Sequence, residues 1–129
     1  MKLELVPVPV ADVDRAKEFY VTQVGFVEDV DVRPATGVRV VQLTPPGSAC
    51  SIVLSTGLAH IDMAAGVIRA LHLVVADIES ARKDLIARGV AVGDIDESSG
   101  PDVRYAPFAD PDGNTWVLQQ MSWRTGAQF

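Results

Sequence analysis

The most regular stretch of the chain is an apolar run over residues 68–75. It contains β-branched side chains and lacks glycine and proline, which favours a strand covered on both faces over a short helix. Because side chains alternate along a strand, Ala70, His72 and Val74 are expected on one face. The pattern therefore predicts a strand that sets a histidine among apolar neighbours.

After this strand the hydrophobic pattern changes to a helical period. Asp77 offers a side-chain oxygen to the N–H groups of a first helical turn, and Gly89 suits the left-handed residue that ends a helix. Four apolar residues recur between them at helical spacing: Ile78, Ala81, Leu85 and Ile86. A helix over 77–89, buried along this stripe, is therefore predicted.

The same pattern occurs earlier, so the chain contains two similar halves. Residues 10–17, VADVDRAK, match residues 75–82, VADIESAR, in residue type at all but one position. The first helix is expected from Asp12 to Val24. It should end at Gly25, which gives it one residue more than its counterpart.

Short strands separated by turns complete each half. They are expected over 3–10, 26–33, 38–43, 50–55, 90–95, 103–108 and 115–121, with a turn over 34–37. Pro7 and Pro9 cannot donate to a strand ladder, so the first strand should lie at a sheet edge or beside a bulge. The chain reads as one domain over 1–129, made of module one (1–56), a linker (57–66), module two (67–121) and a tail (122–129).

This order of elements predicts an α+β fold of two βαβββ modules. Each helix can cover one face of its own sheet, which leaves the opposite faces to be covered in another way. If those faces curve towards each other, they form a mixed sheet around a cleft, which is a common place for a small-molecule site.

Composition narrows the possible partners. The 129 residues are 48% hydrophobic and 22% charged, without an apolar run long enough for a membrane helix and without a secretory leader pattern. The net charge of −6, with no basic cluster, argues against nucleic acid as a partner. Cys50 is the only cysteine, which excludes an internal disulfide and fits a reducing compartment. A protein of the cytoplasm with no membrane partner is expected.

Three motifs resemble the vicinal oxygen chelate superfamily, which includes glyoxalase I, bleomycin-resistance proteins and extradiol dioxygenases. They are VADVDRAKEFY with the following Gly25-Phe26, the repeat at 75–90, and DPDGN at 110–114. The resemblance covers nearly the whole chain. It implies paired βαβββ modules around a cleft, and a homodimer.

In metal-dependent members of that family, the resemblance places a divalent ion on side chains at four positions. Here these positions are Leu5, Ala70, Val117 and, in the first half, a residue near Ser51. Aliphatic side chains offer no nitrogen, oxygen or sulfur donor to a metal. We therefore expect neither the usual metal site nor another cofactor, although a displaced centre using His60, Asp62 and His72 stays open.

His72 is the most informative polar residue, because the predicted strand directs it towards the cleft. It is a candidate ligand contact or a general acid/base, against the alternative of a histidine hydrogen-bonded within a packed sheet. The other candidate ligand-binding residues are Leu5, Pro7, Arg39, Ser51, Val53, Arg104, Phe108, Val117 and Gln119. Tyr105, Met63 and Trp123 are further candidates for lining the cleft, whereas Trp116 is expected in the core.

Two functional hypotheses follow. The preferred one is a metal-free protein that binds a small apolar or aromatic organic molecule, in a resistance, sequestering or carrier role. The alternative is an enzyme of the same superfamily, a lyase, isomerase or dioxygenase, that uses a relocated metal or acid/base catalysis by His72. A fold that serves only a protein partner is the least favoured reading.

Overall fold

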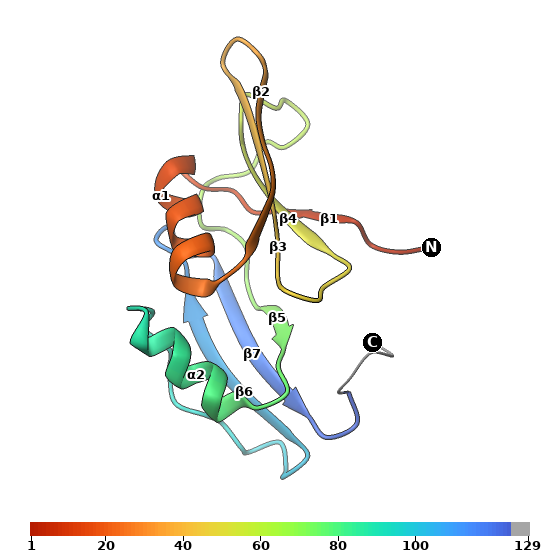
Figure 1. The fold of residues 1–129 in the computed structure, drawn as a ribbon, viewed down its shortest axis with the longest axis vertical. Helices are drawn as coiled ribbons and strands as arrows, with labels where there is room; N and C mark the ends of the chain where they lie inside the picture. Colours follow the sequence, from red (N-terminus) through yellow and green to blue (C-terminus); the bar gives the residue numbers. More distant parts are fainter. Residues whose placement is uncertain (125–129) are drawn as a thin grey trace. The chain divides into compact units, whose positions relative to one another are not determined.

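The computed structural model describes residues 1–124, which form two compact units (Figure 1). The first unit comprises Met1–Ile68 together with Asp110–Asn114, and the second comprises Arg69–Ala109 and the chain from Thr115 onwards. Two modules were predicted, but the DPDGN turn packs with the first unit although it lies within the sequence of module two. Of the tail, residues 125–129 lie outside the described part of the chain.

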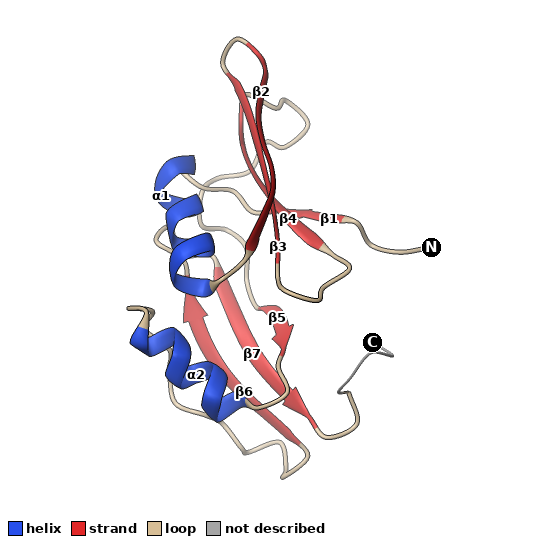
Figure 2. Ribbon diagram, in the orientation of Figure 1, coloured by secondary structure: helices blue, strands red, loops and turns tan. Residues whose placement is uncertain are grey.

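The first unit contains a four-stranded mixed sheet in the order β1-β4-β3-β2 (Figure 2). Its strands are β1 (Leu5–Pro7), β2 (Val27–Ala35), β3 (Val38–Thr44) and β4 (Ser51–Thr56). β1 runs parallel to β4 and lies at the edge of the sheet, as the prolines predicted. It is shorter than the predicted strand over 3–10.

The β2–β3 hairpin is longer than predicted. Ala35 pairs with Val38, so only Thr36 and Gly37 connect the strands, and Gly37 has φ 75°. Pro34 was expected in the turn but lies inside β2, within a register shift between Val32 and Ala35. A bulge leaves one residue out of the ladder, so the missing N–H of proline costs little there.

The first helix consists of an α-helix and a π-helical segment. α1 (Val13–Glu18) is capped by Asp12, whose side chain accepts the Arg15 N–H at 3.1 Å, as predicted. Phe19–Val24 then continues as a π-helix that ends at Gly25, with φ 100°. A π-turn takes up one more residue than an α-turn. It therefore accounts for the extra residue of the first helix relative to the second.

The core of the first unit lies between α1 and the sheet. The buried apolar side chains come from the helix, from alternate positions of β3 and β4, and from the residues that follow β1 and precede β2: Val8, Val13, Ala16, Phe19, Tyr20, Phe26, Val41, Leu43, Ile52 and Leu54. The opposite face of the sheet carries the alternate residues of the same strands. α1 therefore covers one face of its sheet, as expected for this module.

The second unit contains a three-stranded sheet in the order β5-β7-β6, with one helix (Figure 2). Its elements are β5 (Leu71–Val74), α2 (Ile78–Ala87), β6 (Val103–Ala109) and β7 (Thr115–Met121). α2 packs on β6 and β7, and Asp77 caps it by accepting the N–H groups of Glu79 and Ser80. Ile78 and Leu85 are buried as predicted, but Ile86 is exposed and Ala81 only half-buried.

The strand predicted over 90–95 does not form. Gly93 donates its N–H to the carbonyl of Pro107 at 2.8 Å, and Asp96 forms an isolated bridge with Tyr105. Pro107 has no N–H to return the bond, and a Cβ on Gly93 would lie 2.9 Å from the Pro107 ring. The segment therefore lies along β6 without becoming a ladder.

The strand predicted over 68–75 is confined to β5. Ala70 has φ 59°, in the left-handed region, so the chain becomes extended only at Leu71. The expectation that both faces are covered is wrong, because His72 and Val74 are exposed. The described part of the chain holds no helix whose length and hydrophobicity would allow it to cross a bilayer.

Candidate functional site

The two faces of the second sheet differ in burial, because α2 covers only one of them. In the strand register, His72 lies beside Val117, and Tyr105 lies beside Gln119. These four residues and Val74 share the face that α2 does not cover, which we call the open face. The helix-covered face holds the buried residues Ala106, Phe108, Trp116 and Leu118. The candidate site is therefore built on the open face.

His72 and Tyr105 form the polar centre of the open face. Their rings meet edge to face, with centroids 6.0 Å apart and an interplanar angle of 85°. Gln119 directs its side-chain N–H towards the Tyr105 hydroxyl at 3.5 Å, which is the long limit of a hydrogen bond. His72 is exposed, while Val117, Gln119 and Tyr105 are half-buried. Sequence reasoning grouped His72, Val117 and Gln119 correctly and gave Tyr105 only as a further candidate.

The backbone before β5 orients the histidine. The His72 Nδ1 atom lies 2.7 Å from the carbonyl oxygen of Ala70, and the Ala70 N–H donates to the Thr115 hydroxyl, also at 2.7 Å. Thr115 and Ala70 therefore hold the turn that carries this carbonyl. The apolar sequence gave no signal of the turn, because alanine rarely adopts a positive φ.

The candidates in the first unit gather on one face of its sheet. Leu5 pairs with Ser51 and Pro7 with Val53, so the register places all four on the side that α1 does not cover. The Ser51 hydroxyl lies 2.6 Å from that of Thr44. Ser51 and Val53 are buried, while Leu5 and Pro7 are half-buried. These four candidates therefore share one sheet face, and their role in ligand binding stays a prediction.

Arg39 lies on the helix-covered side of that sheet, where its guanidinium group is ion-paired with two aspartates. It is buried and donates to both carboxylate oxygens of Asp31, at 3.0 and 2.9 Å, and to Asp14. Lys17 also binds Asp31 at 2.8 Å. The hydrogen bonds from Arg39 and then Lys17 hold the pKa of Asp31 well below its usual range. Arg39, a candidate ligand-binding residue, is thus a buried, ion-paired arginine that does not share the face of Leu5, Pro7, Ser51 and Val53.

Arg104 and Phe108 also lie away from the open face. Arg104 binds Glu79 at 3.0 Å, Glu97 at 3.3 Å and Gln120 at 3.0 Å. Phe108 is 4% exposed and stacks on Trp116 with ring centroids 6.2 Å apart. Strand alternation places Gln120 and Trp116 on the helix-covered face. Arg104 pairs with Gln120 and Phe108 with Trp116, so both candidates lie on that face as well. The strand register therefore does not bring these two candidates together with His72 on the open face.

The side chains at the family's metal positions do not fit a divalent ion. Leu5, Ala70 and Val117 carry no donor atom, and Ser51 contributes one hydroxyl, which already contacts Thr44. Across residues 1–124, no group of three or more histidine, cysteine, aspartate or glutamate residues is placed to hold a metal. His60 and Asp62 are exposed in the linker.

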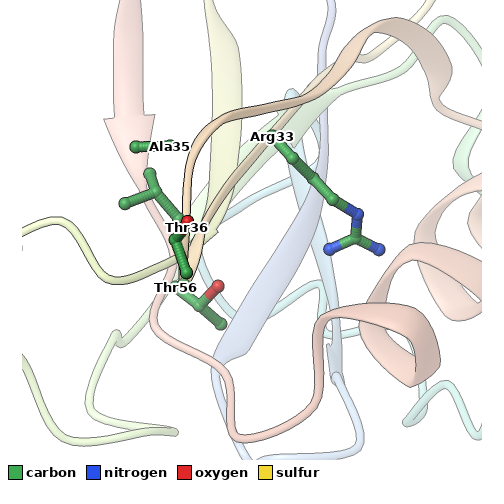
Figure 3. A pocket seen from close by; sticks show the side chains of 6 residues that line it. Arg33, Ala35, Thr36 and Thr56 are labelled. Carbon is green, nitrogen blue, oxygen red and sulfur yellow. The ribbon is translucent and has the colours of Figure 1, made fainter.

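A pocket of about 430 Å³ lies at the tip of the β2–β3 hairpin (Figure 3). It is lined by Arg33, Ala35, Thr36, Gly37, Val38 and Thr56. None of these residues was among the predicted ligand-binding residues, because the sequence pattern indicates only a turn and the ends of strands there. The pocket is formed by the first unit alone.

Comparisons with known proteins agree with this fold. The family model of the Glyoxalase/Bleomycin resistance protein/Dioxygenase superfamily matches residues 2–118. Comparison with curated proteins gave no match.

Solved structures similar to the chain include members of the same superfamily. One is TnmS3, described as an antibiotic binding protein from Streptomyces sp. CB03234, at 38% identity and a TM-score of 0.82, covering 95% of this chain and 97% of that chain. A glyoxalase/bleomycin resistance protein from the same organism has 38% identity, a TM-score of 0.78 and coverage of 92% and 100%. A superfamily member from Sphaerobacter thermophilus has 28% identity, a TM-score of 0.77 and coverage of 93% and 97%. The chain belongs to the glyoxalase/bleomycin resistance protein/dioxygenase superfamily.

Proposed function

We propose that the protein binds a small apolar or aromatic organic molecule on the open face of the second sheet, without a metal ion. The observation that carries the proposal is the exposed imidazole of His72 beside the Tyr105 ring, on a face that also carries Val74 and Val117. Small-molecule sites typically combine apolar surface with a few polar groups that fix orientation. One phenol ring, two aliphatic side chains and one imidazole suit a flat, weakly polar ligand.

The donor chemistry supports metal independence. Three of the four family positions carry side chains that cannot coordinate an ion. A single substitution such as Val117→Glu would supply one donor and leave the set incomplete, so it should not create tight metal binding.

The comparisons support a resistance, sequestering or carrier role. TnmS3, which is 38% identical over 95% of this chain, is described as an antibiotic binding protein. An antibiotic-like organic molecule is therefore a reasonable first class of ligand for this chain. The homodimer that the family resemblance implies and the cytoplasmic location expected from composition stay predictions.

A thermal-shift and fluorescence screen of aromatic and antibiotic-like compounds tests the proposal. It is run on the purified, untagged protein in a chelating buffer and again with Mn²⁺, Fe²⁺, Ni²⁺ or Zn²⁺, after elemental analysis. We expect saturable binding in the chelating buffer and no stoichiometric metal. Near-stoichiometric metal, or binding that requires added metal, would contradict metal independence.

The matched variants are His72→Ala and His60→Ala. Because His72 is exposed, its removal should leave thermal stability nearly unchanged while weakening binding about tenfold, the value of roughly one net hydrogen bond. His60 is an exposed histidine of the linker, so its loss should change neither property. Equal affinity of the wild type and His72→Ala would place the ligand elsewhere.

A second candidate is an enzyme that uses His72 as a general acid or base. The observation that favours it is the Nε2 atom, which has no hydrogen-bond partner among the described residues and lies on an exposed ring. Product analysis of each bound compound separates the two functions. Recovery of unchanged compound after prolonged incubation supports binding alone, whereas conversion that His72→Ala abolishes supports the enzyme.

A further inference from the structure

We infer that the ligand of the open face carries a hydroxyl group of phenolic or enolic character, and that the Nε2 atom of His72 accepts its hydrogen bond. The inference rests on the proposed function, since it specifies the chemistry of the same site. It starts from the geometry that fixes which imidazole nitrogen carries the proton.

The hydrogen bond to Ala70 selects the tautomer of His72. Nδ1 lies 2.7 Å from the Ala70 carbonyl oxygen, and a carbonyl oxygen has no proton to give. Nδ1 must therefore be the donor. In the neutral ring, this leaves Nε2 as a bare acceptor, although a free histidine side chain prefers the opposite tautomer. The protein has thus prepared an acceptor at the exposed edge of the ring.

The turn at Ala70 is strained, and a hydrogen bond to Thr115 maintains it. A non-glycine residue in the left-handed region loses about 1–2 kcal/mol relative to its ordinary conformations, and Ala70 has φ 59°. The Thr115 hydroxyl accepts the Ala70 N–H at 2.7 Å and so holds the turn in place. Strain of this kind persists where the surroundings impose it, often at functional sites. Ala70 and Thr115 are therefore positioning residues for the imidazole.

The surroundings of Nε2 favour a neutral hydroxyl over a cationic donor. The residues next to His72 in the strand register of the open face are Val74, Tyr105, Val117 and Gln119, and none of these four carries a carboxylate that would attract an ammonium group. Asp96, which bridges to Tyr105, brings a carboxylate to this face only beyond Tyr105, on the far side of β6 from His72. An acidic hydroxyl gives a short, strong hydrogen bond to an imidazole nitrogen, and its aromatic or enolic frame suits the apolar neighbours. A phenol meets both conditions.

The tautomer is tested first by nitrogen-15 NMR of the imidazole rings, which needs no ligand. The spectrum is recorded at about pH 8.5, two units above the ordinary histidine pKa of about 6.5. We expect His72 as the Nδ1–H tautomer, with the exposed His60 as the internal control for an unrestrained ring. Thr115→Val should shift His72 towards the Nε2–H tautomer, and Thr115→Ser, which keeps the hydroxyl, should restore it. Nε2–H as the main form in the wild type would overturn the inference.

Ligand chemistry is tested with three probes of one shape: 2-naphthol, 2-methoxynaphthalene and naphthalene. We expect 2-naphthol to bind about tenfold more tightly than its methyl ether, which lacks the donor proton, and His72→Ala to remove this difference. Equal binding of all three probes would overturn the inference and leave the proposed function standing. Failure of all three to bind would contradict both.

Discussion

The hydroxyl of Tyr20 donates a 2.7 Å hydrogen bond to the Oδ2 atom of Asp110, a residue ninety positions later in the chain. Both side chains are buried. The Asp110 carboxyl also accepts the Asn114 side-chain amide at 2.8 Å and the backbone N–H groups of Asp112 and Asn114 at 2.9 and 3.0 Å. The DPDGN turn is thus closed by its own residues and is joined to the first helix by the Tyr20 phenol and by Arg15, which binds Asp112 at 3.2 Å.

Removing that phenol should destabilise the first unit. Tyr20→Phe leaves a buried carboxyl oxygen with one donor fewer, and a hydrogen bond to a charged group contributes about 1.5–3 kcal/mol. We expect the free energy of unfolding to fall by about 2 kcal/mol, measured by urea denaturation at neutral pH.

Tyr105→Phe is the matched control for this prediction. The Tyr105 hydroxyl is half-buried and its Gln119 contact is 3.5 Å long, so its loss should cost less than about 1 kcal/mol. Similar losses in the two variants would mean that the Asp110 network adds no special stability.

Much of the fold could be predicted because local chemistry and the global arrangement agree. Asp12 and Asp77 cap their helices, and Gly25 and Gly89 end them with positive φ. The single extra residue of the first helix was visible in the repeat, but its conformation was not. A π-turn depends on what the surplus residue packs against, and periodicity does not show that.

The predictions that failed concern segments whose structure depends on residues distant in the sequence. The strand over 90–95 fails because of Pro107, which lies in another strand and has no N–H to pair. Arg104 and Phe108 were assigned to the ligand face without the strand register, which places them with Gln120 and Trp116. His72, Val117 and Gln119 do lie on one sheet face, as predicted, because the alternation of side chains within β5 and β7 is enough to place them there.

Gly66 should be essential for the contact between the linker and the DPDGN turn. It has φ 83°, and a Cβ there would lie 2.1 Å from the carbonyl oxygen of Asp112. Gly66→Ala therefore combines a left-handed conformation with a backbone clash, and should cost well over 2 kcal/mol of unfolding free energy.

Gly47→Ala separates the two effects, since Gly47 has φ 80° with nothing within 4 Å of the added atom. It should cost only about 1–2 kcal/mol in thermal or urea unfolding, and equal losses would exclude the clash.

The Arg39 cluster predicts how stability depends on pH. Hydrogen bonds from Arg39 and Lys17 lower the pKa of Asp31 in the folded state, so below about pH 5 the unfolded chain binds more protons and stability falls as the pH falls. Arg39→Gln should cost about 3 kcal/mol at pH 7, because it leaves a half-buried carboxylate without its bidentate partner. The deficit should shrink as the pH falls, because Asp31 of the variant, whose pKa is then lowered by Lys17 alone, becomes protonated at a higher pH than Asp31 of the wild type. Urea unfolding from pH 3 to 7 measures both curves, with Asp14→Asn as the control that removes only the exposed partner. A deficit that stays constant across this range would mean that Arg39 acts through packing rather than through the charge of Asp31.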